Sequence, residues 1–284
     1  MTFSRLAIIG PGLLGGSIAL AVREKRPGNS RVSIWARREE AVEQIRFRNL
    51  ADFASTDLKA VTAEADFIVF CVPIGVMASL AEKITDFVSS KTLITDVGSV
   101  KVPVVESLGR IFGGRGRFVG SHPMAGSEQT GIDAAHAGLF EGAVCIVTPD
   151  KNSAQQDVEA VRQFWAMLGG VPRILSPAEH DEVIALVSHL PHLVAATLVN
   201  LVCAQYPNSL NFCGSGFRDS TRVASGSPGM WAEIFGGNRG QLKKAIHAMI
   251  EKLQEAVRLV DDDAKMQQFL ANAKAQRDRL KKEK

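Results

Sequence analysis

The pattern of apolar and polar positions along the chain changes once, near residue 176. Before this point, short apolar runs typical of buried strands alternate with runs whose apolar residues recur every three or four positions, as in amphipathic helices. After it, the helical spacing continues alone. The pattern therefore predicts an α/β domain over residues 1–175 and an all-α domain over residues 176–284.

The predicted strands of the first half belong to one sheet. The run over residues 66–72 is nearly all apolar, as expected where helices cover both faces, so we predict a parallel sheet. The strands span residues 5–9, 32–35, 66–72, 92–97, 117–120, 143–148 and 171–175, and the last two close the sheet. Residues 117–120 lead into a turn-rich loop that carries His122.

Three glycines with G-x-G-x-x-G spacing lie between the first predicted strand and a helical run over residues 18–23. Gly10 permits a tight turn, Gly12 lets a pyrophosphate approach the backbone, and Gly15 lets helix and strand pack closely. Unpaired N–H groups at the start of a helix also bind phosphate. Although such a motif can be a plain turn, the flanking strand and helix predict a Rossmann-like dinucleotide-binding domain.

The second strand indicates which dinucleotide is bound. It ends at residue 35, where an NAD site normally carries an acid for the ribose hydroxyls, but Ala36-Arg37-Arg38 follows instead. With no carboxylate to repel a 2′-phosphate and two guanidiniums to bind it, NADP is favoured over NAD. The alternative is that both arginines are solvated at a helix start. The predicted cofactor-binding residues are Gly10, Gly12, Leu13, Leu14, Gly15, Arg37, Arg38, Val72 and Pro73.

Two side chains from later strand ends suit redox chemistry. His122 lies downstream of the glycine motif, and a base beside a nicotinamide is the minimum needed to oxidise an alcohol. Ser99 follows the strand over residues 92–97 and can reach the nicotinamide neighbourhood, although it can equally cap the next helix. These positions predict a dehydrogenase.

The helical half offers polar groups at a predicted break. Pro191 is expected to kink or break the helix, and Ser188, His189 and His192 cluster there. The two histidines share a helix face, but no third ligand stands at convincing spacing, so we predict no metal. Further on, Arg218 and Arg222 are one helical turn apart, as suits a carboxylate substrate. For Arg218 a salt bridge to Asp219 or Glu233 is an equally good interpretation.

Apolar residues in the second half also predict association with a second copy. A stripe at steps of three and four forms a packing helix suited to a dimer seam; its members are Leu242, Ile246, Met249, Leu253, Val257 and Val260. Between Glu182 and Arg218 the chain has no charged residue, yet polar groups near the middle of this segment favour a helix buried in protein over a membrane span.

Charge and cysteine content bear on the partners and the cellular location of the protein. The formal net charge of +3 is too small to predict a nucleic-acid partner. The chain shows no signal-peptide pattern before the first strand. Its four cysteines are Cys71, Cys145, Cys203 and Cys213. Their spacing does not suit a metal site, and three of the four lie in apolar runs. These features predict a cytoplasmic protein.

Six segments occur in an order that is specific when they are taken together. They are Gly10-x-Gly12-Leu13-x-Gly15-x-Ser17, Asp96-x-Gly98-Ser99-Val100-Lys101, Ser121-His122-Pro123-Met124-Ala125-Gly126-Ser127-Glu128, His180-Asp181, Ser188-His189-Leu190-Pro191-His192 and Phe217-Arg218-Asp219-x-Thr221-Arg222. The set resembles the prephenate/arogenate (cyclohexadienyl) dehydrogenase family of tyrosine biosynthesis over nearly the whole chain.

The resemblance implies an activity and residue roles. His122 would be the catalytic base, with Ser99 hydrogen-bonded near the nicotinamide and the substrate hydroxyl. The substrate, a small dicarboxylate, would be held by the helical domain, which would also form the homodimer. The implied substrate-binding residues are Ser127, Ser188, His189, His192, Arg222 and, as a weaker match, Arg218.

Two other classes share part of these features. Another NAD(P)-dependent hydroxy-acid dehydrogenase with two domains would have a similar first half, but such enzymes usually use a lysine of the second domain as base. No lysine lies between Lys151 and Lys243. A dinucleotide-binding sensor without turnover would keep the glycines and have no need of His122. The residues also leave prephenate and arogenate undistinguished.

Overall fold

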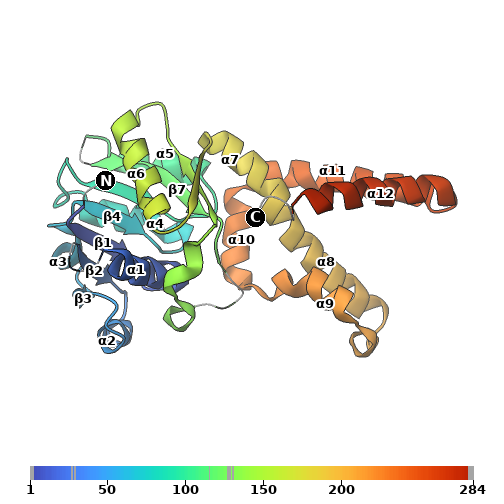
Figure 1. The fold of residues 1–284 in the computed structure, drawn as a ribbon, viewed down its shortest axis with the longest axis horizontal. Helices are drawn as coiled ribbons and strands as arrows, with labels where there is room; N and C mark the ends of the chain where they lie inside the picture. Colours follow the sequence, from blue (N-terminus) through green and yellow to red (C-terminus); the bar gives the residue numbers. More distant parts are fainter. Residues whose placement is uncertain are drawn as a thin grey trace.

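The computed structural model of the protein describes residues 3–26, 28, 30–114, 116–126, 129 and 131–280, and Figure 1 shows a sheet domain joined to a helical domain. A six-stranded parallel sheet has the order β3-β2-β1-β4-β5-β6. Its strands are β1 (Arg5–Ile9), β2 (Arg31–Trp35), β3 (Phe53–Ser55), β4 (Phe67–Phe70), β5 (Leu93–Asp96) and β6 (Arg117–Phe118). The order reverses between β1 and β4, which opens a crevice at the carboxyl ends of these strands.

Helices cover both faces of this sheet, and alternate strand residues enter two separate cores. In β1, Leu6 and Ile8 pack on one side, whereas Ala7 and Ile9 pack on the other. The first core lies under α1 (Leu13–Lys25), α2 (Glu39–Phe47) and α6 (Gln155–Met167). The second lies under α3 (Leu58–Thr62), α4 (Ile74–Ile84) and α5 (Val102–Ile111). The all-apolar strand pattern is thus explained by burial on both faces.

The prediction that the later strands close the same parallel sheet is wrong. They form a second sheet, in which β7 (Gly120–Pro123) pairs antiparallel with β8 (Val144–Thr148) and β8 pairs parallel with β9 (Val171–Ile174). Parallel neighbours need a long crossover, usually a helix. Between β7 and β8 the described residues form only short 3₁₀ turns at Ile132–Ala134 and Ala137–Phe140, so β8 returns antiparallel. Helix α6 supplies the crossover to β9.

This second sheet also corrects the position of His122. The residue was predicted in a turn-rich loop, but it lies within β7 opposite Ile146 of β8. The segment Gly120–Pro123 is buried throughout, and the backbone pairing of a strand fixes the direction of each side chain. The imidazole therefore projects from a rigid element.

The helical domain begins with a long, uninterrupted helical segment. It consists of α7 (Pro177–Ile184), a π-helical segment (Ala185–His189) and α8 (Leu190–Gln205). The predicted break at Pro191 is wrong, because the proline falls in the first turn of α8, where its missing N–H costs little after the wider π turn. The remaining helices are α9 (Ser215–Thr221), α10 (Pro228–Gly237), α11 (Arg239–Leu259) and α12 (Asp263–Arg279).

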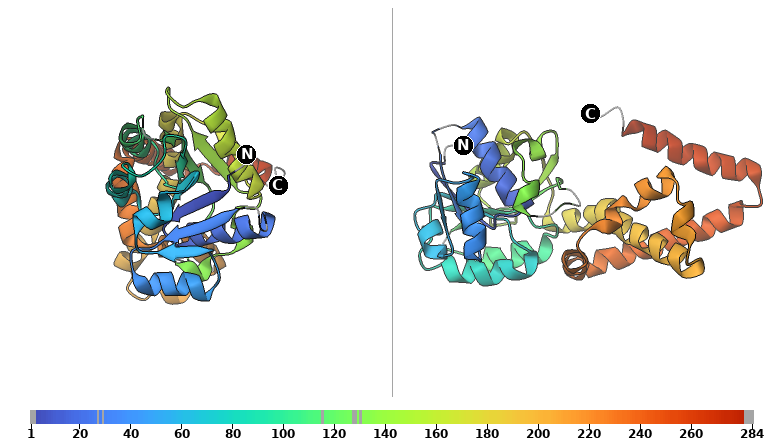
Figure 2. Two further views of the ribbon diagram at one scale, coloured as in Figure 1. Left: turned by 90° about the vertical axis from the view of Figure 1, so that its left-hand side faces the viewer. Right: turned by 90° about the horizontal axis from the view of Figure 1, so that it is seen from below.

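Helix α10 lies against the sheet domain, whereas α11 and α12 project away from it (Figures 1 and 2). Ile234 of α10 belongs to the same core as Met77 and Val100. The outer helices leave apolar side chains exposed, among them Leu201, Leu253, Val257 and Val260. Of the predicted stripe, Leu242 is buried, Ile246 and Met249 are half-buried, and the other three residues are exposed within one chain.

The two sheets are joined through Ser121 of β7, which also accepts a hydrogen bond from the fully buried Trp165 of α6. Trp165 Nε1 donates a hydrogen bond to Ser121 Oγ at 2.9 Å, while Ser121 Oγ donates to the Asp96 carbonyl at 2.7 Å. We expect Trp165→Phe to lower the free energy of unfolding by about 1–3 kcal/mol, because a buried hydrogen bond and part of a ring are lost. Urea unfolding measures this, with the exposed Phe47→Ala as control. An unchanged midpoint for Trp165→Phe would contradict the packing described.

Candidate active site

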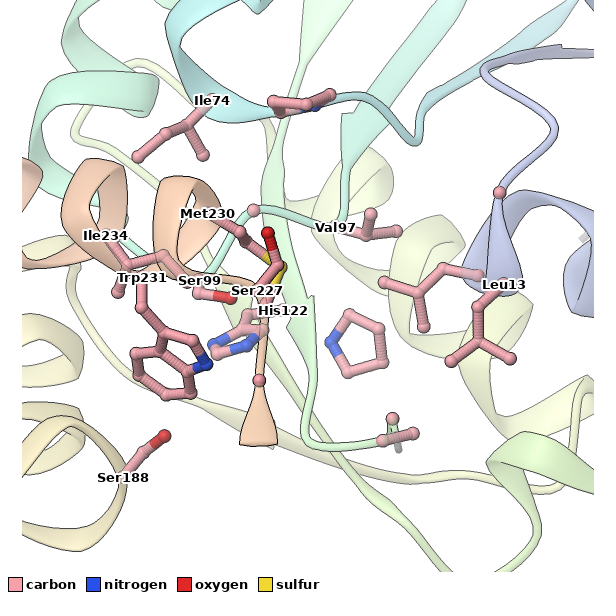
Figure 3. A pocket seen from close by; sticks show the side chains of 18 of the residues that line it. Leu13, Ile74, Val97, Ser99, His122, Ser188, Ser227, Met230, Trp231 and Ile234 are labelled. Atoms are coloured by element: carbon pink, nitrogen blue, oxygen red, sulfur yellow. The ribbon is translucent and has the colours of Figure 1, made fainter. Parts of the chain in front are cut away.

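A pocket of about 620 Å³ lies where the crevice of the parallel sheet meets the helical domain. One end is lined by Gly12, Leu13 and Leu14 at the start of α1. Figure 3 shows Leu13 at this end and Ser99, His122, Trp231 and Ser188 toward the other. The pocket thus runs from the glycine turn to the helices of the second domain.

The glycine turn fits the pyrophosphate of a dinucleotide. Gly10 has φ +110°, and a Cβ there would lie 2.5 Å from the Cys71 carbonyl oxygen. A Cβ at Gly15 would lie 2.0 Å from the Gly10 carbonyl oxygen, so the close packing of helix and strand requires glycine. Gly12 faces open space, and the described residues show no side-chain cap at the start of α1. The N–H groups of its first turn are therefore available to phosphate.

A chain of hydrogen bonds runs from His122 into the helical domain. Its Nδ1 lies 2.9 Å from His180 Nε2, and His180 Nδ1 lies 2.8 Å from Asp181 Oδ1. The Asp181 carboxylate also accepts hydrogen bonds from the backbone N–H groups of Lys101 and Val102 at 2.7 and 2.9 Å. Asp181 therefore caps the start of α5, which has no side-chain cap of its own. Asn238 Nδ2 donates to the Asp181 carbonyl at 2.7 Å.

These contacts assign the tautomers of both histidines. An ionised carboxylate only accepts hydrogen bonds, so His180 carries its proton on Nδ1 and presents a lone pair at Nε2. His122 must then donate from Nδ1, and no hydrogen bond is seen from its own Nε2 to any residue that the structure describes. Because His122 lines the pocket, this nitrogen is available to accept a proton from a bound molecule.

The electrostatic surroundings keep His122 neutral. Burial lowers its pKa well below the ordinary value of 6.5, and His180, Lys101 and His189 lower it further. Lys101 itself is completely buried in an ion pair with Asp96, and its Nζ donates to the Ser121 carbonyl at 2.9 Å. Burial lowers the pKa of the Lys101 ammonium, although Asp96 opposes the change. The base is thus a neutral imidazole carried by strand β7.

The structure brings together some of the predicted site residues and separates others. Ser99, Ser188, His192 and Arg222 line the pocket together with His122, Val72 and Pro73. His189 is buried outside the lining, with Nδ1 3.3 Å from Asn238 Nδ2. Arg218 donates to the Cys213 carbonyl at 2.8 Å and is likewise outside it, as are the exposed Arg37 and Arg38. Ser127 lies outside the described residues.

Comparisons with known proteins agree with this geometry over both domains. Residues 18–174 match the family described as "Prephenate dehydrogenase, nucleotide-binding domain", and residues 176–274 match "Prephenate dehydrogenase, dimerization domain". The chain belongs to the prephenate dehydrogenase family. Membership places it among the NAD(P)-dependent oxidoreductases of tyrosine biosynthesis, as the resemblance implied.

Three relatives show the range of this family. Cyclohexadienyl dehydrogenase of Zymomonas mobilis is 34% identical over 280 residues, covering 96% of this chain and 95% of the relative. Prephenate dehydrogenase of A. aeolicus, solved with hydroxyphenyl propionate and NAD+, has a TM-score of 0.89 and 30% identity, covering 99% of each chain. Synechocystis arogenate dehydrogenase has a TM-score of 0.83 and 28% identity, covering 97% of this chain and 99% of its own.

Several residues of the candidate site were not assigned a role from the sequence. From the sequence, His180 and Asp181 were noted only as one of the six segments. Their position near the start of a predicted helix could have suggested that they form a buried hydrogen-bonded pair. Trp231 gave no signal, yet its ring stacks on His192 with centroids 3.6 Å apart and an interplanar angle of 16°. The alternative role of Ser99 as a helix cap is not observed, since the N-cap of α5 is Lys101.

The neutral histidines make stability depend on pH. Burial lowers the pKa of His122 well below 6.5 and that of His189 to about 4. Below pH 6.5 the unfolded chain therefore binds more protons than the folded one, and stability falls with decreasing pH. We expect the free energy of unfolding in urea to be lower at pH 5.5 than at pH 7.5. In His122→Asn the decline should be shallower; an identical decline would contradict a buried neutral His122.

Proposed function

We propose that this family member oxidises the C4 hydroxyl of prephenate or arogenate and releases CO2, forming 4-hydroxyphenylpyruvate or tyrosine. One observation carries the assignment of the base: His122 lines the pocket, its Nε2 has no hydrogen bond to the described part of the chain, and its Nδ1 is bonded to the His180–Asp181 pair. When bound, NAD(P)+ accepts the hydride from ring C4.

His122 moves one proton in each direction. Its Nε2 accepts the C4 hydroxyl proton while the ring carbonyl forms, and the imidazolium is stabilised through His180 by the negative Asp181. The bond from ring C1 to its carboxylate then breaks, CO2 leaves, and the electron pair makes the ring aromatic. The proton returns from His122 to the ring oxygen, so no net proton is produced. Aromatisation makes the sequence effectively irreversible.

The remaining pocket residues position the substrate. Ser99 lines the pocket with His122, where its hydroxyl suits a hydrogen bond to the reacting C4 oxygen. Arg222 suits the ring carboxylate, because guanidinium pairs with carboxylate through two parallel hydrogen bonds. Ser188 and His192 suit the polar side chain of the substrate, and Trp231 provides a flat wall for its ring.

We also propose NADP as the preferred cofactor and the homodimer as the working unit. Ala36, Arg37 and Arg38 follow β2 without a carboxylate, which suits a 2′-phosphate. The second domain matches a family described by dimerization and exposes apolar side chains on α8 and α11.

Dimerisation also explains why the long helical segment at the start of the second domain is so apolar. Residues Pro177–Gln205 have the length and hydropathy of a membrane span, but His180, Asp181 and His189 in its first half belong to the active-site network. We propose that a second copy covers its apolar side, in a soluble cytoplasmic protein.

The function is tested by following nicotinamide reduction with prephenate or arogenate and NAD+ or NADP+ in four separate assays. We expect turnover with at least one substrate and a lower KM for NADP+ than for NAD+. The double variant Arg37→Ala/Arg38→Ala should raise the KM for NADP+ by about 10-fold or more, since charge-assisted hydrogen bonds are lost. Arg173→Ala serves as an exposed control. No turnover in any assay, with cofactor still bound, would overturn the proposed function.

The role of the base is tested separately with His122→Asn. Asparagine cannot accept a proton, so we expect kcat to fall by about 10²-fold or more, the usual loss for a general base. The Kd of the cofactor, measured by calorimetry without substrate, should change little because the glycine turn is intact. Unchanged turnover would remove His122 from the chemistry.

A further inference from the structure

A second carboxylate of the helical domain reaches the cofactor domain near the pocket. Glu233 of α10 accepts a hydrogen bond through Oε1 from the backbone N–H of Gly75, in the first turn of α4, at 2.8 Å. The two residues are 158 positions apart in the chain. Glu233 also lines the pocket, together with Pro73 and Ile74, which lead into α4. This contact therefore joins the domains beside the cofactor crevice.

Helix α4 needs a partner from elsewhere. Its N-cap residue is Pro73, whose side chain has no hydrogen-bonding atom, and no side chain caps the helix locally. A carboxylate at this position accepts an otherwise unpaired N–H and interacts favourably with the helix dipole. The same arrangement occurs at α5, where Asp181 of the helical domain caps a helix without a cap of its own.

Close packing leaves little freedom around this contact. A Cβ on Gly75 would lie 2.1 Å from Glu233 Oε1, so only glycine admits the carboxylate. One turn further along α10, a Cβ on Gly237 would lie 3.0 Å from Val100 and 3.3 Å from Ile74. Ile234, beside Glu233, is buried in the core of the cofactor domain. Helix α10 thus packs on the start of α4 and on the neighbouring core through three residues, Glu233, Ile234 and Gly237.

We propose that Glu233 is a positioning residue that sets the distance between the cofactor and the substrate. On one side it holds the first turn of α4, which follows the cofactor-binding pair Val72 and Pro73. On the other it belongs to the same helix as Met230 and Trp231, which line the substrate end of the pocket (Figure 3). The inference rests on the proposed function, because that function places a cofactor beside α4 and a substrate beside α10.

The proposal predicts a loss in kcat and little change in cofactor binding. Hydride transfer depends steeply on distance, and a misplacement of about 1 Å can lower a rate by about 10²-fold. In Glu233→Ala we expect kcat to fall about 10-fold or more, while the Kd of the cofactor alone stays within about 3-fold. Glu233→Gln keeps an oxygen that accepts the Gly75 N–H, so it should retain kcat within about 3-fold.

Gly75→Ala tests the same contact from the opposite side. The added methyl group must displace the Glu233 carboxylate, yet alanine favours the helical conformation of α4 more than glycine does. We expect Gly75→Ala to lower kcat as Glu233→Ala does, and the double variant to be no worse than either single variant. Glu82→Ala removes an exposed carboxylate from the same helix and is the matched control.

A readout without turnover separates this proposal from the proposed function. Amide hydrogen exchange at Gly75 should be faster in Glu233→Ala than in the wild type, and close to the wild-type rate in Glu233→Gln. If the wild type turns over neither substrate, the proposed function fails while the exchange data still report the contact. If the wild type is active and Glu233→Ala matches it in kcat, or if the effects of Gly75→Ala and Glu233→Ala simply add, the positioning role is overturned.

Discussion

The active site depends on one carboxylate that holds two elements of different domains together. Asp181 binds the backbone at the start of α5 and, through its other contact, fixes the tautomer of His180 and so of His122. A helix start is a favourable place for a carboxylate, and Asp181 accepts hydrogen bonds from two backbone N–H groups there. The base is therefore oriented only when the two domains are in contact.

A buried ion pair next to β7 affects both the position and the pKa of His122. Lys101 and Asp96 form a completely buried pair whose ammonium also holds the Ser121 carbonyl, one residue before His122. Such a pair adds little net stability, but removing one partner leaves a charge unpaired. Desolvation is the main cause of the lowered pKa of His122, and His180 and then the Lys101 ammonium lower this pKa further. The buried pair therefore holds β7 through the Ser121 carbonyl and also contributes to the lowered pKa of His122.

Local patterns predicted much of this, and long-range contacts account for the rest. Gly10, Gly12 and Gly15 lie close together in the chain, so their spacing, together with the flanking strand and helix, indicates the cofactor site. The second sheet was missed because an apolar run does not reveal its direction or partner, and His122 was consequently placed in a loop. The pairing of His180 with His122 spans 58 residues, and no periodicity encodes such a contact. Arg218 illustrates the converse, since favourable spacing did not bring it to the pocket.

The central claim is that His122 is a neutral base with its proton on Nδ1 and a bare Nε2. Nuclear magnetic resonance of ¹⁵N-labelled imidazoles as a function of pH measures both properties, with the signal identified by its absence in His122→Asn. At pH 6 we expect the shifts of a neutral ring protonated at Nδ1, because burial lowers the pKa well below 6.5. A protonation midpoint at or above about 6.5, or a proton resident on Nε2, would contradict the account.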